Sequence, residues 1–449
     1  MARIAIVGSG FGGYSCARHL ERWLKPGEAE IVLITPKDYT LYVPLLPQVA
    51  AGVLQPRSIV TPLHVRLRDA KLLPGVAMDV DLDRRSCEVL KINGDVTHVP
   101  FDVIVLAPGS ITRTFDIPGL KEHARGMKTL AEAVYLRDHS IAQLELAASS
   151  SDLAEQAVRC GFLVVGGGYS GVETAATLQL VTRSALARFP DLDPGLLRWT
   201  LIDIAPRLMP ELGEQLGADA MRVLTKRGID VRLGVTLESL TAGSAKLTDG
   251  ATLPTNTVIW TAGVTPRPVV SSLGTETLKG RLVVGADLQV PGHDGVFGLG
   301  DAAAVPDLTG PPGSVCGQTA QHAERQAATA ARNALAALRG GRMRYYRHRD
   351  LGMVVDLGGM DAVARPFGMD LSGPVAQLVT RGYHLLTAPS GRSRFRISGD
   401  WLMNLAAGDD LMRLDFLKDS PSTLEELENM PTRMTGRYEQ ISQTVGHRQ

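Results

Sequence analysis

The chain has 449 residues, of which 44% are apolar, and it carries 47 basic and 47 acidic side chains. This length can fill two or three domains, and the balanced charge argues against nucleic acid as a partner. Four widely separated cysteines form no C-x-x-C pair, so we expect neither a metal site nor a redox disulfide. We interpret them as reduced side chains of a cytoplasmic protein.

The first organised stretch begins with the apolar residues 4–7, which lead into Gly8, Gly10 and Gly13 at the G-x-G-x-x-G spacing. This spacing is typical of a strand, a tight turn and a helix that bind a dinucleotide. The glycines allow the turn, the close approach of a pyrophosphate and the packing of the helix, whose free N–H groups attract phosphate. Glycine turns without a ligand are common, so the motif alone leaves the assignment open.

The same apolar residues resemble the start of a signal peptide, but the glycine turn follows them at once. The chain also lacks any uncharged apolar run of about 18 residues, which a membrane-spanning helix needs. We therefore expect any membrane contact to be peripheral, on the inner face of the cell membrane.

A second predicted strand, residues 31–34, ends at Thr35, where dinucleotide sites usually carry Asp or Glu for the adenosine ribose. A threonine hydroxyl can form that hydrogen bond, but more weakly than a carboxylate. Residues 38–52 (DYTLYVPLLPQVAAG) are apolar, and they form either a packed loop or a segment lying along a bound ring. Residues 66–106 alternate short strands with turns, and the APGS stretch at 107–110 then makes a sharp turn.

The dinucleotide pattern occurs a second time at residues 162–178, where Gly166, Gly168 and Gly171 follow a predicted strand at the same spacing. Two such copies, each after a buried-looking strand, are hard to explain by chance. Residues 129–155 have a helical pattern and link the first half of the chain to the second.

A third predicted strand, residues 199–202, places Asp203 at its tip. A carboxylate there accepts a hydrogen bond from a free ribose 2′-hydroxyl and repels a 2′-phosphate, which favours NADH over NADPH. Arg207 follows four residues later and leaves NADPH open. Residues 258–266 (VIWTAGVTP) repeat the strand and glycine turn of residues 103–110.

Asp301 stands at the end of another apolar strand, within GVFGLGDAAAVPD (295–307). Its carboxylate can accept hydrogen bonds from ribityl hydroxyls, although a simple N-cap would have the same sequence. A helix from about Gln318 to Arg339 follows, with three glutamines among its alanines. Short strands, apolar segments at 372–388 and 400–407, and a polar tail complete the chain.

Together these stretches resemble the type II NADH dehydrogenases, single-subunit NADH:quinone oxidoreductases that are flavoproteins with two dinucleotide-binding domains. The resemblance extends from about residue 3 to residue 415. It is carried by IVGSGFGG (6–13), DYTLYVPLLPQVAAG (38–52), VVGGGYSGVETA (164–175), VIWTAGV (258–264), GLGDAAAV (298–305) and TAQHAERQ (319–326).

The resemblance implies an α/β fold with two Rossmann-like domains, one for FAD and one for NADH. It also implies a C-terminal α+β region for membrane docking and dimer contact. We assign the FAD domain to 1–125 and 280–340, the NADH domain to 126–279, the C-terminal region to 341–418 and a polar tail to 419–449.

The same resemblance implies site residues. FAD would contact Gly8, Gly10, Gly12, Gly13, Thr35, Ala77, Gly109 and Asp301. NADH would contact Gly166, Gly168, Gly171, Asp203 and Gly263. Glu173 matches a glutamate near the flavin that is linked to proton movement, and it acts either as a general acid/base or as a hydrogen-bonding neighbour. Gln321 matches the first glutamine of the A-Q-x-A-x-Q quinone motif, and Arg325 stands where the second is expected; Glu173 and Gln321 are the candidate catalytic residues.

The sequence departs from the family pattern at four positions and in the C-terminal region. Thr35 replaces an acidic residue, Pro108 a threonine, Arg325 a glutamine and Leu351 a lysine. The C-terminal segment is less apolar than the family's membrane helices, since it is interrupted by Arg381, Arg392, Arg394 and Arg396.

The resemblance implies a homodimeric enzyme of the respiratory chain, which takes hydride from NADH and passes two electrons through FAD to menaquinone, ubiquinone or another small acceptor. The alternative is a soluble NAD(P)H-dependent flavoprotein reductase, or diaphorase, with a non-quinone acceptor. Sulfide:quinone oxidation is less favoured because Cys160 and Cys316 show no evident pairing. A further hypothesis is a flavin-binding sensor without enzymatic activity.

Overall fold

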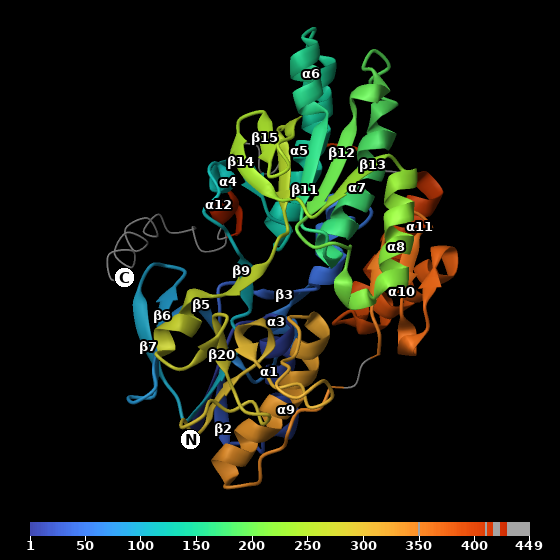
Figure 1. Ribbon diagram of the computed structural model, residues 1–449. Coiled ribbons are helices and arrows are strands. Elements are labelled where there is room, and N and C mark those ends of the chain that lie inside the picture. The colour runs from blue at the N-terminus through green and yellow to red at the C-terminus, as the bar shows by residue number, and fades with distance from the viewer. Residues whose placement is uncertain (349–350, 409–410, 416–422, 429–449) are drawn as a thin grey trace.

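The computed structural model describes residues 1–348, 351–408, 411–415 and 423–428. It contains two units built on parallel sheets and a smaller C-terminal unit (Figure 1). The first unit lies at the bottom of the view, the second at the top, and the C-terminal helices at the right. This architecture confirms the predicted α/β class with two Rossmann-like sheets.

The first unit is organised around a seven-stranded sheet with the order β21-β8-β1-β2-β5-β6-β7. Its strands are β1 (Ala2–Val7), β2 (Ala29–Thr35), β5 (Lys71–Asp81), β6 (Ser86–Lys91), β7 (Val96–Pro100), β8 (Val103–Leu106) and β21 (Val296–Gly298). The parallel part runs from β21 to the start of β5, and β6 and β7 are antiparallel. Central parallel strands are covered on both faces, which explains the unbroken apolar run of β1.

Two helices of the first unit pack against each other beside this sheet: α1 (Phe11–Trp23) and α9 (Ala320–Arg339). Small residues allow this close packing, because Ala327, Ala330, Ala331 and Ala334 of α9 are fully buried. Smaller elements of the unit are β3 (Tyr39–Leu41), β4 (Val60–Pro62), β19 (Thr277–Leu278), β20 (Arg281–Val283), β22 (Ala303–Ala304), α2 (Leu46–Ala50) and α3 (Leu63–Arg66).

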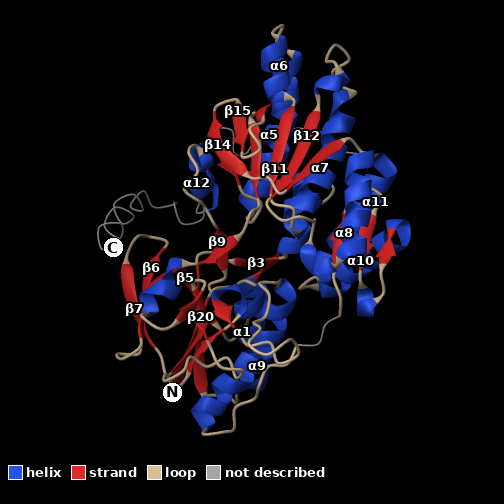
Figure 2. Ribbon diagram, viewed as in Figure 1, coloured by secondary structure: helices blue, strands red, loops and turns tan. Residues whose placement is uncertain are grey.

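The second unit contains a five-stranded parallel sheet with the order β10-β17-β11-β12-β13 (Figure 2). Its strands are β10 (Ala124–Arg125), β11 (Gly161–Val165), β12 (Arg198–Asp203), β13 (Ile229–Leu233) and β17 (Thr257–Trp260). Around it lie α4 (Leu120–His123), α7 (Tyr169–Leu186), α8 (Glu214–Lys226) and a small sheet of β14 (Leu237–Thr241), β15 (Ser244–Leu247) and β16 (Thr252–Pro254). Phe162 and Trp199 stack across neighbouring strands, with ring centroids 4.6 Å apart.

The two units are joined by a two-stranded antiparallel ribbon, in which β9 (Ser110–Thr112) pairs with β18 (Val264–Pro266). The chain enters the second unit after β9 and returns through β18, so the ribbon contains both crossings (Figure 1). β9 follows the carboxyl end of β8, and β18 follows the carboxyl end of β17. The carboxyl edges of the two sheets therefore meet at this ribbon.

Strand pairing differs from the expected domain boundaries. β10 belongs to the second sheet, although residues 124 and 125 were expected in the first domain. Residues 268–273 pack against β5, and β19 pairs with β20, although both lie before the boundary expected at residue 280. A two-residue strand and a short turn have no periodic signal of their own. We therefore place both boundaries at the ribbon.

The helical pattern expected over residues 129–155 corresponds to two helices, α5 (Leu130–Ala148) and α6 (Leu153–Arg159). A capping box between Thr129 and Glu132 starts the first helix. The second begins where the Asp152 carboxylate accepts a hydrogen bond from the Ala154 N–H at 2.8 Å. This local cap ends the continuous helix that the composition suggested.

The C-terminal unit has the expected α+β composition. It contains a three-stranded antiparallel sheet of β23 (Val354–Asp356), β24 (Ala362–Ala364) and β25 (Leu371–Ser372), followed by α10 (Gly373–Thr387) and α11 (Gly391–Ala407). No helix in the described part of the chain is both long and apolar enough to span a bilayer.

The polar tail expected from residue 419 is described only at 423–428. These residues include the short helix α12 (Leu424–Glu428). Leu424 is 1% exposed, and the Glu428 carboxylate accepts the Thr112 N–H at 2.9 Å. This contact attaches the tail to β9. The rest of the predicted tail lies outside the described residues.

Candidate dinucleotide and acceptor sites

The first glycine loop lies between β1 and α1. Gly8 has a φ of +96°, and a Cβ at Gly13 would lie 1.8 Å from the Gly8 carbonyl oxygen. Only glycine permits this approach of helix to turn. A Cβ at Gly10 would have no heavy atom within 4 Å, and no side chain caps the start of α1. The helix N-terminus is therefore open to an anionic group.

The second glycine loop, between β11 and α7, has the same geometry. Gly166 has a φ of +116°, and a Cβ at Gly171 would lie 1.7 Å from the Gly166 carbonyl oxygen. Gly168 again has open space on its Cβ side, and no side chain caps α7. The sequence repeat is thus a structural repeat, with one anion-binding helix terminus in each unit.

The residues at the strand tips distinguish the two loops. In the second unit Asp203 accepts the N–H of Gly167 and, at 2.6 Å, that of Ala205. In the first unit the Thr35 and Ser9 hydroxyls are hydrogen-bonded at 2.7 Å. Thr35 therefore occupies the position of the usual acid and contacts its loop, but without a charge.

The other predicted cofactor residues have different surroundings. A Cβ at Gly12 would lie 2.5 Å from Leu299, so this glycine permits close packing. Ala77 is buried on β5, three residues beyond Pro74, where pairing with β2 ends. Gly109 and Gly263 both have positive φ and stand just before the two ribbon strands. Gly263 thus lies between the units rather than within the second loop alone.

Asp301 faces the same ribbon. The Ser110 hydroxyl donates to its carboxylate at 2.5 Å, and the Lys128 ammonium lies 3.9 Å from that oxygen and donates to Ser110 at 2.6 Å. The N-cap of α9 is Thr319, and Asp301 lies in a 3₁₀ turn outside that helix. The simple N-cap interpretation of Asp301 is therefore wrong. Burial lowers the pKa of Lys128, and the charge of Asp301 opposes this shift.

Glu173 lies in the first turns of α7, where the second unit meets α2 and the C-terminal unit. It is 8% exposed, and its Oε1 accepts the backbone N–H of Asp356 at 2.9 Å. The Asp356 carboxylate is also buried and accepts from the side-chain amides of Gln48 at 2.5 Å and Gln377 at 3.0 Å. Burial raises the pKa of Glu173 well above its usual range; the backbone hydrogen bond from Asp356 opposes this shift, and the Asp356 charge adds a smaller upward contribution.

The two residues expected at a quinone site face different neighbours. The Gln321 amide on α9 donates to the Gly352 carbonyl at 3.0 Å and to the Tyr383 hydroxyl at 3.3 Å. Arg325, one turn further along α9, instead acts electrostatically on His322 and Tyr346. The structure therefore brings Gln321 to the C-terminal unit.

The sequence analysis did not identify Asp356, Gln377, Tyr383 or Lys128 as site residues. It included Gln48 only within the apolar stretch 38–52. Gln48 had a signal, because it is the only amide in the apolar stretch 43–54. The others stand in ordinary polar positions of helices, strands and turns. Only long-range packing identifies them.

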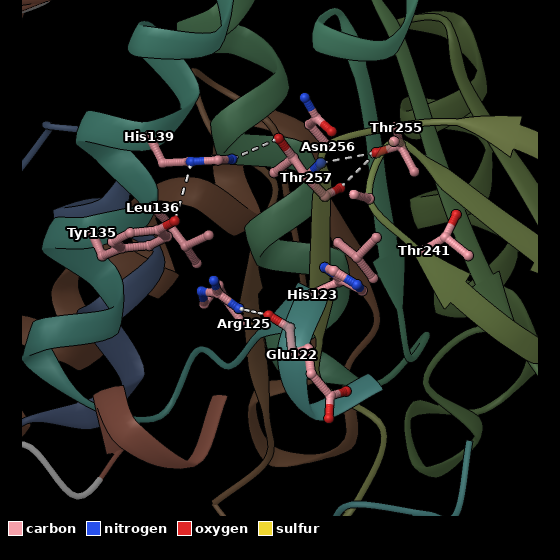
Figure 3. A pocket seen from close by; sticks show the side chains of 13 residues that line it. Glu122, His123, Arg125, Tyr135, Leu136, His139, Thr241, Thr255, Asn256 and Thr257 are labelled. Atoms are coloured by element: carbon pink, nitrogen blue, oxygen red, sulfur yellow. Dashed lines mark hydrogen bonds between the residues drawn. The ribbon is translucent and has the colours of Figure 1, made fainter. Parts of the chain in front are cut away.

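A separate cavity of about 310 Å³ lies in the second unit, between α5, β10, the β14–β15 turn and the start of β17 (Figure 3). One of its two histidines, His139, bonds to Thr257 at 3.0 Å and Tyr135 at 3.3 Å, and burial lowers its pKa to about 4. The cavity is at the amino end of β17, whereas parallel sheets bind ligands at carboxyl ends. It is therefore not the dinucleotide site.

Two glycine loops at facing sheet edges, with Asp301 at the ribbon between them, define a two-dinucleotide oxidoreductase. Residues 2–329 match the model of the pyridine nucleotide-disulphide oxidoreductase family. The type II NADH:quinone oxidoreductase Ndh of Mycobacterium tuberculosis is 31% identical over 85% of this chain and 83% of its own. The demethylphylloquinone reductase NdbB of Synechocystis is 30% identical over 94% and 98%. The chain belongs to the type II NADH:quinone oxidoreductase family.

Solved structures share this fold. NDH2 from Plasmodium falciparum, solved with NADH, superposes with a TM-score of 0.82 over 92% of this chain and 99% of its own, at 17% identity. The sulfide:quinone oxidoreductase of Aquifex aeolicus has a TM-score of 0.67 over 91% and 96%, at 18% identity. These likenesses describe the fold alone.

We predict that Gly171→Ala destabilises the protein, because the added methyl group would collide with the Gly166 carbonyl oxygen. Overpacking of this kind costs about 1–3 kcal/mol, and thermal unfolding followed by circular dichroism measures it. Gly168→Ala is the matched control and should melt with the wild type. Equal melting of Gly171→Ala and the wild type would contradict the observed loop geometry.

Proposed function

We propose that this chain oxidises NADH and passes the two electrons to a quinone, with FAD as the bound relay. The observation that carries the proposal is the meeting of two equivalent dinucleotide loops at one ribbon. Two nucleotides bound there would approach each other without any change of fold. The names of the relatives, quinone oxidoreductases and a quinone reductase, support the choice of acceptor.

The residues of the first unit fit FAD. The open side of Gly10 would take the diphosphate at the start of α1, and Asp301 would accept hydrogen bonds from ribityl hydroxyls. Thr35, Ala77 and Gly109 lie along the same carboxyl edge. When bound, FAD supplies the redox chemistry, accepting a hydride equivalent and releasing electrons to the acceptor.

The second unit would hold NADH at Gly166, Gly168 and Gly171, with Asp203 at the adenosine ribose. The Asp203 carboxylate favours a free 2′-hydroxyl and repels a 2′-phosphate. Arg207, which could attract such a phosphate, is exposed four residues further along the chain. The charge nearest the loop therefore selects NADH.

Glu173 is the candidate acid. Reduction of a quinone by NADH consumes one proton in addition to the hydride, giving NAD⁺ and the quinol. Burial raises the pKa of Glu173 well above its usual range, which favours the protonated carboxyl. It can therefore donate that proton and recover one from solvent.

We assign the acceptor site to Gln321 and Tyr383, whose side chains contact each other between α9 and α10. An amide N–H and a phenol O–H are both donors, which suits a quinone carbonyl. Arg325 was expected at this site, and its charge acts on His322 and Tyr346. Tyr383 was not expected there and is added to the site by its contact with Gln321.

The C-terminal helices carry the proposed contact with the membrane surface. Seven large apolar side chains of α10 and α11 are exposed: Val375, Leu378, Leu386, Phe395, Leu402, Met403 and Leu405. Arg392 is exposed among them, and Arg394 is oriented by a 2.8 Å bond to the Leu386 carbonyl. An apolar face bordered by arginine is typical of a helix that lies in the surface of an anionic bilayer.

Sulfide chemistry is disfavoured despite the likeness to a sulfide:quinone oxidoreductase. The chain has four cysteines, all of them buried and none in a disulfide. Cys160 precedes β11 in the second unit, whereas Cys316 lies between β22 and α9 in the first. Burial raises the pKa of both thiols to about 11, so neither is a ready nucleophile.

The central test is anaerobic. The purified protein, loaded with FAD, should lose its oxidised flavin absorbance when NADH is added and regain it when a menaquinone or ubiquinone analogue follows. A spectrum that stays oxidised would contradict NADH oxidation. Reoxidation by artificial dyes but by no quinone would favour a diaphorase.

We predict that Asp203→Asn reduces the preference for NADH. The substitution keeps an acceptor oxygen but removes the charge, and a hydrogen bond to a charged group contributes about 1.5–3 kcal/mol. The ratio of kcat/KM for NADH to that for NADPH should fall by about tenfold or more. Asp230→Asn on the exposed side of β13 is the control, and an unchanged ratio in Asp203→Asn would exclude the proposed role.

The membrane contact is tested by a triple variant, Leu378→Ser, Phe395→Ser and Leu402→Ser. Each buried apolar side chain contributes about 1.5–3 kcal/mol, so co-sedimentation with phosphatidylglycerol vesicles should weaken by at least about tenfold. Leu153→Ser on α6, where the leucine is 70% exposed, is the matched control. Unchanged sedimentation of the triple variant, with loss of a dimer in ultracentrifugation, would assign the face to a second copy.

A further inference from the structure

The buried carboxyl groups of Glu173 and Asp356 form an unequal pair. They come from positions 183 residues apart and are linked by the hydrogen bond from the Asp356 backbone N–H to Glu173. Both side chains are less than 9% exposed. When two carboxyl groups lie close together with little solvent around them, ionising both of them costs free energy. One of the two therefore keeps a proton.

Hydrogen bonding decides which carboxyl is ionised. Three donors converge on Asp356: the Gly358 N–H at 2.7 Å and the side-chain amides of Gln48 and Gln377. The Trp401 indole N–H, which can only donate, binds the Gln48 carbonyl oxygen at 2.8 Å. Gln48 must therefore present its NH₂ group to Asp356, whose carboxylate oxygen accepts that hydrogen bond.

Among the residues that the structure describes, no ion pair is found at the Asp356 carboxylate. Arg227 donates to the Leu357 and Gly358 carbonyls and to Asp361, and Arg381 lies over the Trp401 ring and 3.5 Å from the Gly359 carbonyl oxygen. The ion pairs within the described residues include neither Glu173 nor Asp356. The Asp356 charge is therefore held by neutral donors alone.

The remaining titratable neighbours are neutral. On α10, burial lowers the pKa of His384 to about 4, and its Nδ1 lies 3.1 Å from the Tyr42 hydroxyl. Burial raises the pKa of Tyr42 above its usual value. α2 contributes no ionisable side chain. At neutral pH the formal charge facing Glu173 is thus that of Asp356.

We propose that Asp356 is a positioning residue whose fixed negative charge keeps the proton on Glu173. The proposal rests on the function proposed above, because that proton is the one that quinone reduction consumes. Gln48 from the first unit, Glu173 from the second, and Asp356 with Gln377 from the C-terminal unit meet here. The proton is therefore stored where all three parts of the chain join.

Infrared spectroscopy of the FAD-loaded protein tests this without NADH or quinone. The carbonyl stretch of a protonated carboxylic acid should be present at neutral pH in the wild type and absent in Glu173→Gln. In Asp356→Asn, the pH at which that band is half lost should fall by on the order of one unit or more, since a like charge has been removed. Asp356→Ser, which also removes the charge, should shift it the same way if the Asn variant folds poorly.

Two further variants separate charge from packing. Asp356→Glu retains the charge and should keep the wild-type midpoint. Asp361→Asn removes a carboxylate from the same loop, one paired with Arg227 at 2.6 Å, and should leave the midpoint unchanged. A band missing from the wild type, or a midpoint unmoved in both uncharged variants, would overturn the proposal.

The pH profile of quinone reduction provides the kinetic readout. Its alkaline limb should move to lower pH in Asp356→Asn by the same amount as the infrared midpoint. An infrared shift in a protein that reduces no quinone would support the charge pair while refuting the proposed function. Quinone reduction with no infrared shift would support the proposed function and refute the charge pair.

Discussion

The β9–β18 ribbon is the constraint on which the rest of the structure depends. Its strands are three residues long each and pair in one antiparallel register, from Ser110 opposite Pro266 to Thr112 opposite Val264. Because each strand leaves the carboxyl end of its own parallel sheet, the pairing sets the two ligand-binding edges against each other. Asp301, Ser110 and Lys128 interact beside it. Neither unit alone contains a complete electron path.

The repeated unit shows how little sequence a dinucleotide loop requires. In both copies the third glycine lies against the carbonyl of the first, and the second leaves the helix terminus open. The position that varies is the strand tip, with the neutral Thr35 in one copy and the charged Asp203 in the other. A single side chain thus distinguishes two sites whose backbones are equivalent, and the charged one suits a coenzyme that must be chosen among close analogues.

Sequence predicted the parts of this molecule that local geometry dictates. Glycine spacing follows from a steric contact within about six residues, and the buried strands before each loop are read from an unbroken apolar run. The contacts that join the units could not be predicted in this way. Gln48 and Asp356 are 308 residues apart, and Gln321 and Tyr383 are 62 apart. A polar side chain at such a position looks like any solvated residue until the fold buries it.

The same limit explains why the strand pairing differs from the expected boundaries. β10 has two residues and takes its place from pairing with β17 rather than from its own composition. The short helix at residues 424–428 likewise has a contact far away in the sequence, because Glu428 accepts a backbone N–H of β9. Short segments whose structure comes from a neighbour carry no periodicity from which to infer it.

The indole of Trp401 has a wider consequence, because it belongs to α11, the helix that carries the exposed apolar side chains. Its N–H fixes the orientation of the Gln48 amide, which in turn donates to the Asp356 carboxylate. The packing of α11 therefore bears directly on a hydrogen bond to a carboxylate in the interior, through one tryptophan.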